Sequence, residues 1–194
     1  MSRIFWDTNI FIYLFENYGN LSEQAAALRS KMLVRGDRLL TSALTLGEIL
    51  VKPTEQHNGE LCRNYEEAIL ATSLVLPFDN KAARNYAFLR CDRSLRAPDA
   101  IQLACASAAG VDLFVTNDAR LQGKQVEGIQ FIVSLDRIQK LGVSCVAVDN
   151  VAGAEMCVRH LLSIGHCKIG ILREPPFAKR RREHTKSATG APRS

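Results

Sequence analysis

The stretch RIFWDTNIFIYLF at residues 3–15 decides the fold, because it joins a short apolar run to an acidic turn and then to an apolar helix. Residues 3–6 favour a β-strand, and Asp7, Thr8 and Asn9 are three turn-forming and helix-capping residues in succession. Residues 10–15 are apolar enough to form the first turns of a buried helix. The sequence therefore begins with a strand, a polar turn and a helix.

The same alternation continues along the chain. Further strands are expected at residues 38–41, 73–76, 112–115 and 130–133. Helices are expected at 22–36, with Ser22 as N-cap, and at 42–51, 60–70, 81–90 and 98–110, with Pro53 just beyond the second of these. Strands that alternate with helices of this length imply a parallel sheet covered on both faces. We therefore predict a three-layer α/β/α domain over residues 1–138.

The distribution of charge limits what the net charge of +5 can mean. Residues 1–138 hold 15 Lys or Arg and 16 Asp or Glu, so this part is balanced. Residues 173–194 hold seven basic and two acidic residues and almost nothing to bury. We expect this segment to be a disordered basic tail, and the net charge to say little about the partners of the main body.

The sequence has no apolar run of about 20 residues and no signal-peptide core, so we expect a cytoplasmic protein that does not bind membranes. Its six cysteines form no CxxC pair and are expected to be reduced and mostly buried. A group of possible zinc ligands is formed by Cys157, His160, His166 and Cys167. The pattern of the surrounding residues, described below, explains this group better than zinc does.

Four acids lie just after strands or at the beginnings of helices: Asp7, Glu48, Asp99 and Asp118. Side chains at the carboxyl ends of parallel strands meet at one edge of the sheet, so Asp7, Glu48 and Asp118 should converge there. Asp99 joins them if its helix begins at that edge. Like charges at close range raise one another's pKa unless a cation neutralises them. Mg²⁺ or Mn²⁺, which bind carboxylate and water oxygens, would do so and would orient a water for attack on a phosphodiester.

Each acid also has a purely structural interpretation. Asp7 could cap the next helix, and Thr45 with Glu48 fits a capping box. Asp99 follows Pro98 in a first helical turn, where an acid complements the helix dipole, and Asp118 ends an ordinary turn. Taken together, four acids at positions that converge favour a metal site.

Five stretches of the chain carry a family pattern: WDTNIFIY at 6–13, TSALTLGEIL at 41–50, LPFDNKAARNYAFLR at 76–90, APDAIQLACA at 97–106 and LFVTNDARL at 113–121. In this order they resemble the PIN-domain ribonucleases, most closely the VapC-like toxins of type II toxin–antitoxin systems. The resemblance covers about residues 3–138 and includes all four acids. It implies a Mg²⁺-dependent endoribonuclease that cleaves RNA with a metal-activated water, binds a small cognate antitoxin and forms a homodimer.

The resemblance also implies a role for each acid. Asp7 and Asp99 are the expected principal ligands of Mg²⁺, with Mn²⁺ as a substitute. Glu48 and Asp118 complete the catalytic cluster through water or a second ion. Side chains that orient these carboxylates are expected at Thr8, Asn9 and Thr116.

Residues 143–172, VSCVAVDNVAGAEMCVRHLLSIGHCKIGIL, restart a strand–helix–strand pattern. They resemble the regulatory domain of the LacI family of transcription factors, in which Gly165-His166 would end the helix. The match covers one βαβ unit of a far larger domain, without the DNA-binding helices and with little of the effector pocket. We expect residues 139–172 to be a partial fragment, from a fused or broken reading frame, that binds no sugar effector.

Two alternative functions remain open at this point. The first is a transcription-regulator fragment of the LacI family, which the second resemblance suggests. The other is a non-catalytic RNA-binding protein that uses the run Arg180-Arg181-Arg182 in its tail, with salt-sensitive affinity for any sequence.

Overall fold

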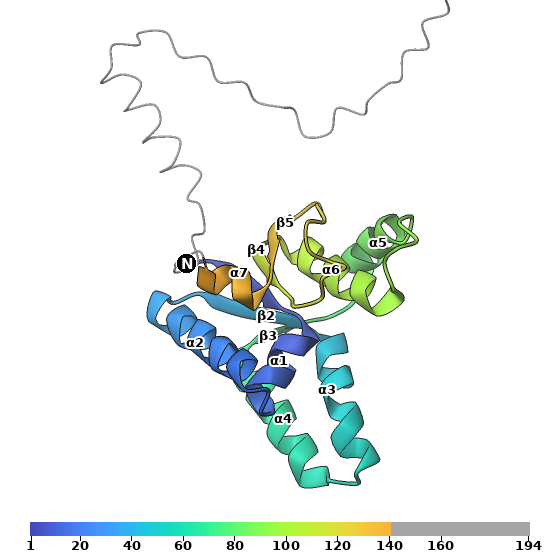
Figure 1. The fold of residues 1–194 in the computed structure, drawn as a ribbon. Coiled ribbons are helices and arrows are strands. Elements are labelled where there is room, and N and C mark those ends of the chain that lie inside the picture. Colours follow the sequence, from blue (N-terminus) through green and yellow to red (C-terminus); the bar gives the residue numbers. More distant parts are fainter. Residues whose placement is uncertain (141–194) are drawn as a thin grey trace, which may run out of the picture. The chain divides into compact units, whose positions relative to one another are not determined.

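The computed structural model describes residues 1–140, which lie within one compact unit (Figure 1). Five strands form a parallel sheet in the order β3-β2-β1-β4-β5. The strands are β1 (Arg3–Trp6), β2 (Arg38–Ser42), β3 (Leu74–Leu76), β4 (Val111–Val115) and β5 (Ile129–Val133). The helices in this part of the chain are α1 (Thr8–Phe15), α2 (Asn20–Arg35), α3 (Ala43–Glu55), α4 (Gly59–Thr72), α5 (Asn80–Leu89), α6 (Ala97–Ala109) and α7 (Leu135–Lys140).

The helices cover both faces of the sheet. Successive side chains of a strand point to opposite faces, so Ile4 and Trp6 of β1 join one buried cluster and Phe5 joins another. The first cluster contains residues of α1, α2, α3, α4 and α7, and the second contains residues of α5 and α6. The predicted three-layer α/β/α fold with a central parallel sheet is therefore confirmed.

The position of β1 brings distant segments together at one edge of the sheet. Strand β1 lies at the centre, with β2 on one side and β4 on the other. Trp6 is in register with Val115, and the Asp7 N–H donates to the Val115 carbonyl oxygen at 3.0 Å. Because all strands are parallel, the residues that follow β1, β2 and β4 emerge at the same edge, which we call the C-terminal edge.

A glycine allows the segment before β5 to pass close to α6. Gly128 has a φ of +77°, and a Cβ atom there would lie 2.4 Å from the carbonyl oxygen of Ser107. The Ser107 hydroxyl donates to the Glu127 carbonyl oxygen at 2.6 Å, and this bond holds the segment before β5 against α6. A larger residue at position 128 would have to push this segment away from the helix that carries Asp99.

The structure corrects two helix boundaries. Helix α2 begins at Asn20, and Ser22 does not cap it but accepts a bond from the Tyr18 N–H and donates to the Glu16 carbonyl oxygen. Pro53 lies inside α3 and is buried, because a proline in the last turn removes only one backbone hydrogen bond while its ring packs into the interior.

Several predictions concern residues beyond this part of the chain. The basic tail at 173–194 and the LacI-like fragment at 139–172, apart from its first two residues, lie outside the described residues. Of the three cysteines in residues 1–140, Cys105 is buried as expected, Cys62 is partly exposed and Cys91 is exposed, and all three are free. Within residues 1–140 no helix is both long enough and apolar enough to cross a bilayer.

Candidate active site

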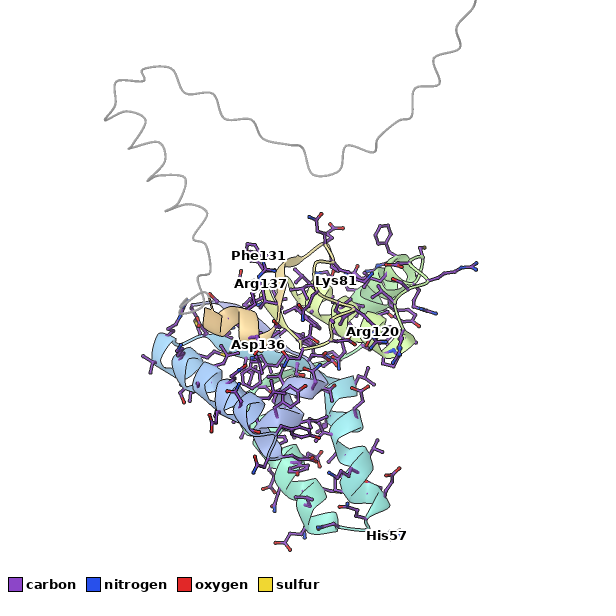
Figure 2. All side chains as sticks on the ribbon, in the orientation of Figure 1. His57, Lys81, Arg120, Phe131, Asp136 and Arg137 are labelled. Carbon is purple, nitrogen blue, oxygen red and sulfur yellow. The ribbon has the colours of Figure 1, made fainter. Side chains whose placement is uncertain are left out.

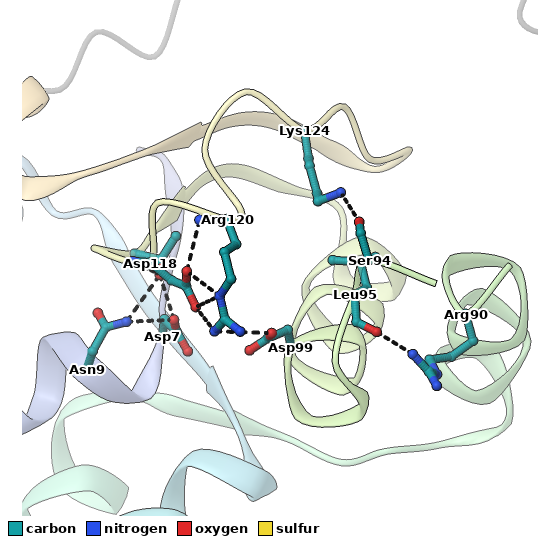
Figure 3. A network of polar contacts seen from close by, with 10 residues as sticks. Asp7, Asn9, Arg90, Ser94, Leu95, Asp99, Asp118, Arg120 and Lys124 are labelled. Atoms are coloured by element: carbon teal, nitrogen blue, oxygen red, sulfur yellow. Dashed lines mark hydrogen bonds and ion pairs between the residues drawn. The ribbon is translucent and has the colours of Figure 1, made fainter. Parts of the chain in front are cut away.

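Asp7 lies at the C-terminal edge, between the end of β1 and the beginning of α1. It is the N-cap of α1, and its Oδ1 accepts the Thr8 N–H at 2.8 Å. Its Oδ2 accepts from the amide nitrogen Nδ2 of Asn9 at 2.9 Å and from the Thr116 hydroxyl at 2.6 Å (Figure 3). These bonds fix the orientation of the carboxylate, and all of the donors are uncharged.

The electrostatic surroundings of Asp7 oppose its ionisation. Burial raises the pKa of Asp7 to about 6, the hydrogen bonds from Thr116 and Thr8 lower it in part, and the negative charges of Glu48 and Asp99 raise it further. The charges of Glu48 and Asp99 are thus close enough to act on Asp7. A cation bound beside Asp7 would offset both the cost of burying the charged carboxylate and its repulsion by Glu48 and Asp99.

The pKa of Asp7 predicts a pH-dependent stability in the cation-free protein. Because folding raises this pKa from 3.8 to about 6, the protonated carboxyl stabilises the fold below its unfolded pKa, and this contribution is lost as the pH rises through the folded value. Asp7→Asn should therefore increase the free energy of unfolding at about pH 7.5 and lose this advantage toward about pH 4. Urea unfolding of both proteins in EDTA measures the difference. A difference that does not change with pH would contradict the raised pKa.

Glu48 lies on α3 and is connected to α1 through Thr8. The Thr8 hydroxyl donates a short hydrogen bond to Oε2 of Glu48 and also accepts from the side-chain amide of Gln102 at 3.0 Å. The predicted capping box is wrong, since Ser42 is the N-cap of α3 and accepts the Thr45 N–H at 3.3 Å. Glu48 is therefore not used as a helix cap.

A buried glutamine connects three segments beneath the site. Nε2 of Gln102 on α6 donates to the hydroxyls of Thr45 and Thr8, and its Oε1 accepts from the Ser42 hydroxyl at 2.6 Å. Gln102, Thr45 and Ser42 have almost no exposed surface. These residues were not predicted from the sequence. The signal was the position of Gln102, three residues after Asp99, where both side chains lie on one face of the helix.

Asp118 and Asp99 are joined by an arginine that the sequence analysis also missed. The Arg120 guanidinium contacts both carboxylate oxygens of Asp118, with Nε at 2.9 Å from Oδ1 and 3.1 Å from Oδ2. Its Nη2 lies 3.6 Å from Oδ2 of Asp99, at the beginning of α6 (Figure 3). The hydrogen bonds from Arg120 are the main reason that the pKa of Asp118 lies below its ordinary value, and the charge of Arg96 contributes in the same direction.

The seven residues predicted for the site lie around the C-terminal edge and are connected to one another. Thr116 donates to Asp7 and accepts the Asp118 N–H at 3.0 Å, so it joins the turn after β4 to the turn after β1. Asn9 reaches the same turn, since its Oδ1 accepts the Asn117 N–H at 3.3 Å. The side chains are nevertheless not arranged around a common point: within residues 1–140, no three Asp, Glu, His or Cys side chains form a ready set of metal ligands.

The donor chemistry of the site fits a hard divalent cation. Every candidate ligand is a carboxylate oxygen, the kind of ligand that Mg²⁺ and Mn²⁺ prefer. Burial is the main reason that the pKa of Asp7 is raised, and the negative charges of Glu48 and Asp99 add to it, so a cation near Asp7 would be favoured. Of the four acids, only Asp99 and Asp118 have an ion-pair partner among the described residues, and for both it is Arg120.

Solved structures with a similar fold include toxin–antitoxin proteins. VapBC2 from Rickettsia felis, bound to a DNA fragment from its promoter, has a TM-score of 0.56 at 16% identity and covers 68% of this chain and 98% of that one. DNA-bound VapBC from Salmonella typhimurium has a TM-score of 0.53 at 21% identity and covers 70% and 99%. At these identities the likeness shows the fold alone. No curated protein matches the chain.

The sequence itself matches a protein family over most of the described residues. Residues 4–126 match the PIN domain, a stretch that contains all four acids and every residue that positions them. PIN domains are nucleases, and they generally use divalent metals. The resemblance to PIN domains is thereby confirmed over residues 4–126, and the chain belongs to the PIN domain family.

Proposed function

We propose that the chain is a Mg²⁺-dependent endoribonuclease and the toxin of a type II toxin–antitoxin pair, with its nuclease domain at residues 1–138. The observation that carries the proposal is the surroundings of Asp7. This carboxylate is fixed by uncharged donors and lies within the field of Glu48 and Asp99, with a pKa raised to about 6. Such a group gains most from a bound cation, and it belongs to a domain whose family consists of nucleases.

We assign the residues of the site two kinds of role: some bind the cation, and others orient the residues that bind it. Asp7 and Asp99 hold Mg²⁺, or Mn²⁺ in its place, and Glu48 and Asp118 complete the cluster through water or a second ion. When bound, the cation supplies an activated water for in-line attack on the phosphodiester and stabilises the charge that develops. The protein orients the carboxylates in advance through the donors already described: Thr8, Asn9 and Thr116.

The charge of the site makes RNA binding depend on the cation. Four carboxylates at the C-terminal edge repel the RNA backbone, and Arg120 is already engaged with two of them. A divalent cation at Asp7 and Asp99 cancels most of this negative charge and offers the phosphate a positive ligand, so we expect phosphate to bind there after the metal.

The proposed protein partner is a small antitoxin. Its support is the fold shared with the DNA-bound VapBC structures from Rickettsia felis and Salmonella typhimurium. We also propose a cytoplasmic homodimer that has no sugar effector.

Truncation after Ala147, the end of the compact unit, separates this proposal from an RNA-binding basic tail. The truncated protein keeps the whole C-terminal edge and should cleave RNA at the rate of the full chain, with EDTA stopping both. If the basic tail supplied the function instead, the truncated protein would lose all RNA binding. Gel-based cleavage and filter binding at two salt concentrations measure both properties. Loss of binding together with intact folding by circular dichroism would refute the nuclease interpretation.

A further inference from the structure

Arg120 is a cation in the middle of an acidic site. The residue lies in the turn after β4, two positions after Asp118, and its side chain reaches across the C-terminal edge to the first turn of α6 (Figures 2 and 3). Its guanidinium contacts both oxygens of Asp118 and one oxygen of Asp99. A single side chain therefore spans two of the four acids.

The other two acids have no such partner in residues 1–140. The hydrogen bonds of Asp7 come from Thr8, Asn9 and Thr116, and that of Glu48 comes from the Thr8 hydroxyl, all of them uncharged donors. Arg120 supplies the positive charge that keeps Asp118 and Asp99 close together without a metal ion.

We propose that Arg120 is an internal counter-ion, which holds Asp99 and Asp118 in the cation-free protein and competes with the divalent cation for them. The inference rests on the proposed function, because it takes Asp99 to be a metal ligand. It also gives a physical reason why the acids are not arranged around a common point: two of them are turned toward a guanidinium.

Competition follows from the atoms involved. Arg120 lies 3.6 Å from Oδ2 of Asp99, one of the two oxygens that this carboxylate offers to a cation, and its positive charge would repel a divalent ion bound to the same carboxylate. A cation must therefore displace Arg120 or bind less tightly beside it.

The surroundings of Arg120 allow it to leave. Its side chain is 44% exposed, whereas those of Asp99 and Asp118 are each 20% exposed, so the guanidinium can move into water without becoming an unpaired buried charge. Asp118 stays in place when this happens, because its Oδ1 also accepts the backbone N–H of Arg120 at 2.9 Å.

The test measures Mn²⁺ binding by calorimetry in the absence of RNA, with the full-length protein and its Arg120→Gln, Arg120→Lys and Arg84→Gln variants. Arg84 is exposed on α5, so its replacement removes the same charge away from the site. We expect Arg120→Gln to bind Mn²⁺ about tenfold more tightly than the wild type, because one unit of competing charge is gone. Arg120→Lys should fall between them, because an ammonium cannot make the forked contact, and Arg84→Gln should match the wild type.

A second measurement follows thermal stability. Without cation, Arg120→Gln should melt at a lower temperature than the wild type, and added MgCl₂ should raise its Tm by more than it raises that of the wild type. Equal or weaker Mn²⁺ binding by Arg120→Gln would overturn the proposal. Unchanged Mn²⁺ affinity together with weaker RNA binding would do so as well and would make Arg120 a phosphate ligand.

Asp7→Asn separates failure of this inference from failure of the proposed function. Wild-type Mn²⁺ binding that disappears in Asp7→Asn upholds the metal site, whatever Arg120→Gln does. Absence of Mn²⁺ binding in both the wild type and Arg120→Gln would overturn the metal site and the counter-ion together.

Discussion

Asp7→Asn should lower the rate of Mg²⁺-dependent RNA cleavage by about 100-fold or more, because a neutral amide replaces a charged oxygen ligand. The variant keeps an N-cap for α1, since Asn caps helices as well as Asp does. It also removes a carboxylate whose pKa is raised by burial and by two negative neighbours. The Tm at about pH 7.5 should therefore be higher while the activity is lost.

Asp79→Asn is the matched control for this experiment. Asp79 is the N-cap of α5, where its Oδ1 accepts the N–H groups of Lys81 and Ala82, and it is not one of the four acids at the C-terminal edge. The same change of charge at a helix N-terminus should leave cleavage intact. Wild-type cleavage by purified Asp7→Asn would remove Asp7 from the site and with it the main support for the proposed function.

Gln102→Leu should lower the free energy of unfolding by about 3 kcal/mol, and hence Tm by about 10 °C. The substitution keeps the approximate volume but removes the partners of three buried hydroxyls, on Ser42, Thr45 and Thr8. Each buried polar group that loses its partner costs about 1–3 kcal/mol, whereas the leucine recovers only part of this through its apolar surface. Cleavage should fall as well, because Thr8 positions Glu48.

Gln24→Leu provides a control in the same protein. Gln24 is as buried as Gln102, but only its Nε2 has a partner, Asp136 at 3.1 Å, and its Oε1 has none among residues 1–140. Gln24→Leu should lower the free energy of unfolding by about 1 kcal/mol or less. The variant loses one hydrogen bond, but it also removes a buried oxygen that has no partner, and the second change offsets part of the first. Equal destabilisation by the two variants in urea unfolding would show that the hydrogen-bond network beneath the site contributes nothing specific.

The alternation of strands and helices could be predicted because each element has a local signal. The run at 3–6 is apolar and stops at a capping residue, and the helix at 97–109 ends at Gly110, whose φ is positive. Helix α7 has no comparable signal: it is six residues long, and its first N–H is held by the side chain of Asn117, 18 positions earlier. Periodicity does not encode a contact of that kind.

The site residues that could be predicted are those whose position in the sequence is enough to place them at the edge of the sheet. Asp7, Glu48 and Asp118 follow strands, so parallel topology alone places them at one edge, whereas Asp99 joins them only because α6 begins there. Gln102 was missed because its position three residues after Asp99 shows which face of the helix it shares but not that it is buried. Arg120 was missed because an arginine two residues after an aspartate is common on protein surfaces, and its reach to Asp99 depends on where α6 begins.

The central position of β1 in the sheet determines when, during folding, the candidate site is completed. Thr116, which orients the Asp7 carboxylate, lies more than a hundred residues after it, on a turn that reaches the C-terminal edge only when β4 pairs with β1. Pairing over such a separation forms late in folding. A chain in which β4 has not yet paired therefore lacks the contacts that orient Asp7, so the candidate site is completed only with the sheet itself.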